Sequence, residues 1–182
     1  MRIDERCIRQ TEAEMARLNN SLSEAFGKRV NSPSARTAWK TAAENFHRYE
    51  SPVFALWSDE AREGILQGKG AWREGAMLYL ALSPRFHRSG YLRDRLCHLL
   101  KQCELSRNER EELRAILLQT LVRRPSTGRF RHDCQLAARW ADDAFTARVR
   151  ELAMRKDGWT RGRAQRMLDV IEQNEKLWSN ES

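Results

Sequence analysis

Residues 106–123, SRNEREELRAILLQTLVR, carry the signals of a complete helix from its first turn to its buried face. Ser106 is a preferred N-cap residue, and Glu109 three positions later completes a capping box. Four apolar residues then recur at the spacing of one helical face: Leu113, Ile116, Leu117 and Leu121. The stretch therefore predicts a helix with one face in a core.

Helical spacing also dominates the segments on both sides of this helix. An N-terminal helix is expected over about residues 11–27, with Gly27 as its C-cap. Ser32 followed by Pro33 marks the start of a second helix, and a third is expected to run from Val53 to Ile65. Alternating β-branched residues do not persist beyond a few positions, so the predicted fold class is all-α.

The starts of alternate predicted helices are evenly spaced along the chain. Ser34, Ala71, Asn108 and Asp143 lie 37, 37 and 35 residues apart. This spacing resembles a HEAT-like α-helical repeat, which implies an irregular array of helical hairpins (a HEAT-like α-solenoid) over about residues 34–176. An irregular helical bundle is the alternative, and it follows if residues 131–156 form one long helix. Either way we expect a single domain over residues 1–182, with residues 177–182, including Trp178, as a short tail.

Three short windows hold more positive charge than the whole chain. They are PRFHRSGYLRDR (84–95), RRPSTGRFRH (123–132) and RKDGWTRGRAQR (155–166), called here the first, second and third basic windows. Their net charges are +3, +4 and +4, against +8 for the chain, so the remaining residues total −3. Charge gathered at recurring turns is typical of a surface that faces phosphate.

The windows supply the candidate binding residues. Arginine binds phosphate through a planar two-pronged fork, and a helix start adds free N–H groups. The candidate phosphate contacts are Arg85, Arg88, Arg93, Arg123, Arg124, Arg129, Arg131, Arg161 and Arg163. Tyr91 and Trp159 could stack on bases, although large rings at helix starts more often hold their turn against the core. We therefore predict a non-enzymatic protein that binds DNA or RNA largely independently of sequence.

Two other functions remain open. In the first, the chain is a helical adaptor whose basic windows bind an acidic protein; in the second, it is a helical enzyme acting on nucleic acid or nucleotides. The His132–Asp133 dyad resembles the metal motif of helical phosphohydrolases, but it lies in a strongly cationic window that repels metal. Cys97, His98, Cys103 and Cys134 do not have the sequence spacing that zinc ligands usually show, so no zinc site is expected. No catalytic residue, metal or cofactor is predicted.

The remaining features concern location. The N-terminal residues lack the apolar core of a secretory signal, and the longest apolar run, residues 76–82, is far too short to span a membrane. The four cysteines show no CxxC spacing, which is typical of reduced thiols in a cytosolic protein. We expect a cytoplasmic protein without a membrane partner.

Overall fold

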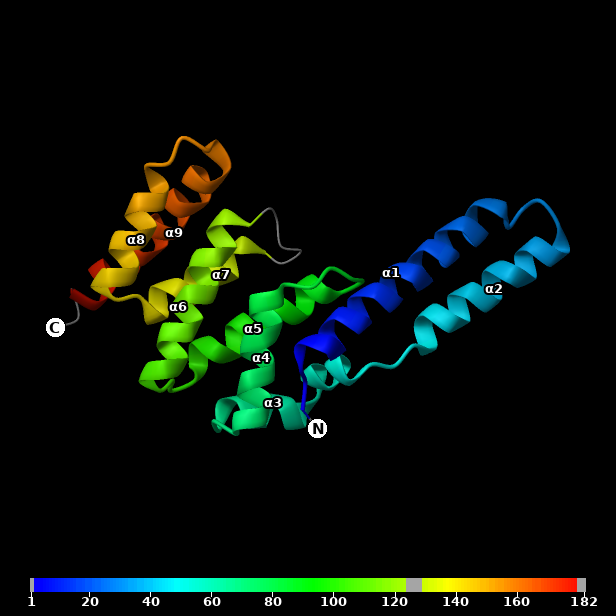
Figure 1. Cartoon of the computed structure of the whole chain (residues 1–182), viewed down its shortest axis with the longest axis horizontal. Helices are drawn as coiled ribbons and strands as arrows, with labels where there is room; N and C mark the ends of the chain where they lie inside the picture. The colour runs from blue at the N-terminus through cyan, green and yellow to red at the C-terminus, as the bar shows by residue number, and fades with distance from the viewer. Residues whose placement is uncertain (1, 124–128, 180–182) are drawn as a thin grey trace.

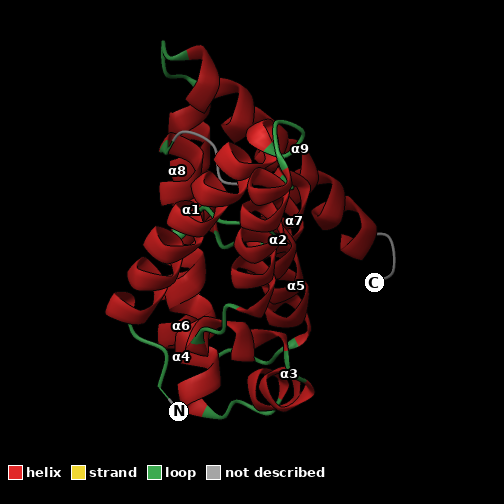
Figure 2. Cartoon of the chain, turned by 90° about the vertical axis from the view of Figure 1, so that its right-hand side faces the viewer, coloured by secondary structure: helices red, strands yellow, loops and turns green. Residues whose placement is uncertain are grey.

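The computed structural model describes residues 2–123 and 129–179, and within these ranges every regular element is a helix (Figure 2). The all-α prediction is therefore confirmed. In chain order the elements are α1 (Glu5–Lys28), α2 (Pro33–Arg48), the 3-10 helix η1 (Pro52–Trp57), α3 (Asp59–Leu66), α4 (Gly70–Leu82), α5 (Ser89–Gln102), α6 (Arg107–Val122), α7 (Phe130–Trp140), α8 (Asp143–Ala153) and α9 (Gly158–Ser179).

Most of the helices form a two-layer array. α1, α4, α6 and α8 contact one another in succession, and α3, α5, α7 and α9 do the same in a second layer. Each helix of the pairs α4–α5, α6–α7 and α8–α9 also contacts its partner across the layers (Figure 1). The main core lies between them, with Leu80, Leu96, Leu117 and Leu136 at most 1% exposed. Burial of such side chains is the main stabilising term of the array.

The first expected hairpin does not form. The spacing of helix starts pairs α2 with α3, but α2 packs mainly against α1. The C-terminal part of α1 projects from the array together with α2 as an arm (Figure 1). A small separate core of Met15, Leu18 and Phe46 holds this arm together. α3 packs instead against η1, α4 and α5. The other three expected pairs, which begin with α4, α6 and α8, are present.

Polar caps decide where the helices begin. The capping box at Ser106 and Glu109 is confirmed. Ser58 accepts a hydrogen bond of 3.0 Å from the backbone N–H of Ala61 and begins α3, so the expected helix from Val53 to Ile65 is divided. Asp142 likewise accepts one of 2.8 Å from the N–H of Phe145, which divides residues 131–156 into α7 and α8. A side-chain acceptor satisfies N–H groups that a continuous helix would bond internally.

The two ends of the chain also differ from expectation. α1 starts at Glu5, because Asp4 accepts a hydrogen bond of 2.8 Å from the N–H of Cys7, and it passes through Gly27 before ending at Lys28. α9 extends to Ser179 and includes Trp178, whose side chain lies outside the described part. Along the described ranges, no helix combines the length and apolar composition that crossing a membrane requires.

Candidate nucleic-acid interface

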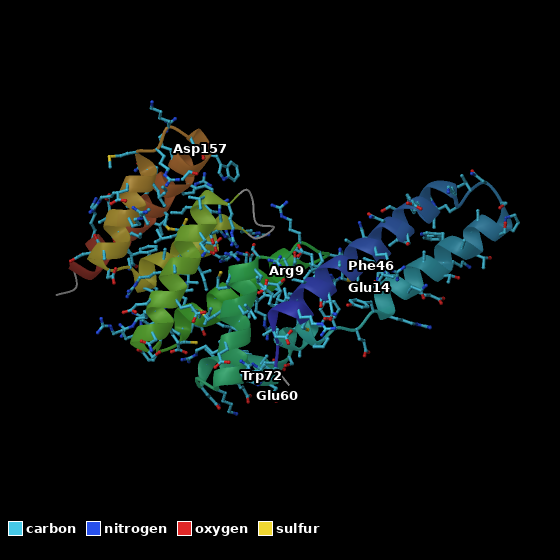
Figure 3. The ribbon with its side chains drawn as sticks, viewed as in Figure 1. Arg9, Glu14, Phe46, Glu60, Trp72 and Asp157 are labelled. Carbon is cyan, nitrogen blue, oxygen red and sulfur yellow. The ribbon has the colours of Figure 1, made fainter. Side chains whose placement is uncertain are left out.

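The three basic windows occupy the turns inside the three helix pairs. The first joins α4 to α5, the second joins α6 to α7, and the third joins α8 to α9. Because the helices of each layer follow one another in order, the described residues of these turns lie along one side of the array (Figure 1). We call this side the basic edge. Figure 3 shows Asp157 in the third window at the end of the edge farthest from the arm.

Direct contacts join the windows. The backbone N–H of Arg129 donates a hydrogen bond of 2.9 Å to Asp94, which links the second window to the first. The guanidinium carbon of Arg163 lies 3.9 Å from the centroid of the Phe130 ring, which links the third window to the second. The described residues of the second window therefore contact both the first window and the third.

Six of the nine candidate arginines are exposed along this edge: Arg85, Arg88, Arg123, Arg129, Arg131 and Arg161. A hollow of about 290 Å³ brings Arg88 of the first window together with Arg129 of the second. Arg123 donates a hydrogen bond of 2.7 Å to the carbonyl oxygen of Ala81, at the end of α4. Arg124 lies outside the described residues.

Arg93 is a correction to the predicted set. Its side chain is 2% exposed, and its Nη2 lies 2.6 Å from Oδ1 of Asp133, which is equally buried. Burial alone would lower the pKa of Arg93, but the Asp133 carboxylate raises it above its usual value. A guanidinium enclosed and paired in this way holds helices together and does not face a phosphate.

Arg163 occupies an intermediate position. Its guanidinium lies over the Phe130 ring and 5.3 Å from the centroid of the Trp159 ring, and its burial lowers its pKa. Among the described residues, Nε and Nη2 of Arg163 have no hydrogen-bond partner. The main contacts of this side chain are therefore cation–π contacts, and the one with Phe130 joins α9 to α7.

The two candidate stacking residues lie on the surface. Tyr91 is 64% exposed at the start of α5, and Trp159 is 43% exposed at the start of α9. Neither ring is buried as a packing residue would be, although Trp159 lies beside Arg163. Both are placed where a base could reach them.

The structure places one more arginine, Arg9 of α1, beside the candidate arginines of the first and second windows. The sequence did not single out this residue. A hollow of about 330 Å³ between α1, α4 and α6 is lined by Arg9, Arg85 and Arg123. Glu12 also lines it and accepts a hydrogen bond of 2.7 Å from the backbone N–H of Arg85. Figure 3 shows Arg9 on α1 beside the turn between α4 and α5. Because α1 is remote in sequence from the windows, only the packing of α1 on α4 reveals this residue.

Two further arginines act inside the fold at helix ends. Arg73 donates hydrogen bonds of 3.1 and 2.9 Å to the carbonyl oxygen of Ile65, near the end of α3. Arg114 donates one of 2.8 Å to the carbonyl oxygen of Trp140, at the end of α7, and pairs with Asp142 at 2.6 Å. These guanidinium groups satisfy carbonyls that have no partner within their own helix.

The residues that the sequence offered for a metal site make other contacts or are buried as free thiols. Asp133 is buried in its pair with Arg93, and His132 lies 3.9 Å from Asp94. All four cysteines are free thiols, and burial raises the pKa of Cys97 and Cys134. In the described part of the chain, no group of three His, Cys, Asp or Glu side chains is placed to hold a metal ion.

Comparison of the chain with models of protein families, with curated proteins and with solved structures gave no match.

Proposed function

We propose that this chain is a non-enzymatic nucleic-acid-binding protein that contacts phosphates through the basic edge. The observation that supports this proposal is the arrangement of the three windows along one side of the array, joined through Asp94 and Arg163. We also propose that the two-layer stacking of helix pairs is a HEAT-like array and that the protein acts in the cytoplasm.

The proposed binding rests on electrostatics. Exposed arginines at successive turns form a row of cations that can follow a phosphate backbone, and each neutralised phosphate releases condensed counterions. Contacts of this kind fix the position of the strand but carry little sequence information. We therefore expect binding that is strong at low salt and nearly independent of base sequence.

The test is fluorescence anisotropy of the full chain with labelled random-sequence oligonucleotides, at about 50 and 200 mM salt. We expect binding at the lower concentration and a clear loss at the higher one. The charge reversal Arg129→Glu with Arg131→Glu should weaken binding strongly. A matched reversal on the exposed face of α2, Arg36→Glu with Lys40→Glu, should weaken it much less. Absence of binding to every oligonucleotide at the lower salt would refute the proposal.

A second candidate function is an adaptor for an acidic protein, and the tip of the arm favours it. Val30 is 81% exposed and Phe26 is 48% exposed there, and the guanidinium of Arg29 lies 3.4 Å from the centroid of the Phe26 ring. Exposed apolar side chains beside cations are typical of protein contact surfaces. Poly-glutamate that displaces the oligonucleotides at equal charge concentration would favour this function.

A further inference from the structure

An aromatic hollow of about 370 Å³ lies where the arm meets the array. Its walls come from α1, α2, η1 and the first basic window, and Figure 3 shows Phe46 of α2 at the end of the arm nearest the array. A volume of this order is in the range of small-molecule sites, which take about 300–1,000 Å³. We call it the aromatic hollow.

Ring contacts between these segments fix the walls. The Phe54 and Phe86 ring centroids are 6.1 Å apart, and those of Phe46 and His87 are 5.4 Å apart. Tyr49 packs edge-on against Phe54, at 6.0 Å. Such pairs stabilise one another beyond their area of burial, so the hollow is formed before any ligand arrives. Trp57 also lines it and is 36% exposed.

The charge of the hollow has one sign. Among the residues that the structure describes, no carboxylate lines it, whereas Arg88 does. Arg88 and Phe86 also line the neighbouring hollow, together with Tyr91, Arg129 and the carboxylate of Asp94, which accepts a hydrogen bond from the backbone N–H of Arg129. The aromatic hollow therefore places rings beside the Arg88 guanidinium, and the neighbouring hollow places the Tyr91 ring near Arg88 and Arg129. A single nucleic-acid strand presents the matching alternation of flat bases and phosphates.

We propose that the aromatic hollow receives one unpaired nucleobase of a single strand. Arg88 binds the phosphate beside that base, the next base stacks on Tyr91, and Arg129 binds the following phosphate. A duplex cannot fill the hollow in this way because its bases are paired and stacked inside the helix. This inference rests on the proposed function and names single-stranded DNA or RNA as its substrate class.

The decisive experiment compares three labelled oligonucleotides with the unmodified protein: a single strand, the same backbone without bases, and a duplex of equal length. We expect the intact strand to bind about a hundredfold more tightly than the abasic one, because the base in the aromatic hollow and the base on Tyr91 each contribute about 1.4 kcal/mol. Equal affinity for the intact and abasic strands would overturn this inference while leaving the basic edge as the binding surface. Failure of all three to bind would refute the proposed function itself.

A pair of tryptophan variants locates the effect. Trp57→Ala should lower the affinity for the intact strand several-fold and leave the affinity for the abasic strand unchanged. Trp39→Ala is the matched control, because Trp39 packs edge-on against Phe26 near the tip of the arm. An equal loss in both variants would overturn the placement of the base. If Trp57→Ala does not fold, the comparison of the intact and abasic strands with the unmodified protein still tests whether the protein binds unpaired bases.

Discussion

Arg93 and Asp133 form an ion pair at 2.6 Å in which each side chain is 2% exposed. The same guanidinium donates a hydrogen bond of 2.9 Å to the carbonyl oxygen of Leu80 and one of 3.3 Å to Thr120. One arginine of α5 thereby contacts α4, α6 and α7, and it fixes two neighbouring helix pairs against each other.

Removing one partner of this pair should strongly destabilise the protein. Arg93→Met leaves the Asp133 carboxylate buried without its cation, and we expect a loss of about 3–5 kcal/mol in the free energy of unfolding. The double variant Arg93→Met with Asp133→Leu should recover much of that loss, because no buried charge remains unpaired. Urea denaturation of the three proteins measures both values. A single variant as stable as the parent would show that the pair contributes nothing.

Leu117 should be among the most sensitive apolar positions. It is fully buried in α6, so Leu117→Ala should cost about 2–5 kcal/mol through lost transfer energy and the cavity left behind. Leu118, which is only partly buried on the same helix, is the matched control and should cost clearly less when changed to Ala. A reversed order in thermal or urea unfolding would place the core on the wrong face of α6.

The salt dependence of binding should report the number of phosphate contacts. Six exposed arginines acting on a single strand give a slope of log affinity against log salt of about −4, at roughly 0.7 counterions per phosphate. Removing Arg129 and Arg131 together by substitution with Ala should flatten this slope by about one to two. Base preference should stay unchanged, which competition with homopolymers measures. An unchanged slope would exclude both side chains from the contact.

Stability should fall at alkaline pH. Burial raises the pKa of Cys134 from 9.0 to about 12, and the pKa of Cys97 is raised as well. Above pH 9.0 the unfolded chain therefore loses thiol protons that the folded chain keeps, and rising pH favours unfolding. The effect is at most about 1.4 kcal/mol per pH unit for each thiol. Urea unfolding between pH 8 and 11 measures it, and Cys134→Ala should show a shallower decline.

The helix caps explain how far the sequence could predict the fold. Ser106 with Glu109 and Ser32 with Pro33 are local signals, and the structure uses both. Ser58 is a signal of the same kind, but the apolar spacing from Val53 to Ile65 continues through it and hides the break. Because α2 is amphipathic, the sequence alone did not determine whether it packs on α1 or α3.

The candidate binding site was predictable as a set of turns but not residue by residue. A charge count over a window ignores helical phase, which is why Arg93 was placed with the exposed arginines. Its spacing from Leu96 and Leu100 puts it on the buried face of α5, and Asp133 has the same relation to Leu136 and Trp140 on α7. An arginine and an aspartate, each on the apolar face of its helix, were the sequence signal that could have predicted this buried ion pair. Arg9 and the aromatic hollow depend on contacts between distant segments, which no local pattern contains.

The separate core of the arm has a consequence for how the molecule opens. Met15, Leu18 and Phe46 are few side chains to hold two long helices, and α2 contributes only Phe46 as a buried residue. Regions with few buried contacts open by themselves while the rest of the protein stays closed. The backbone amides of α2 should therefore exchange with deuterium well before those of α5 and α6. A bound strand that fills the space between arm and array would slow that exchange, so the arm can report occupancy without any label.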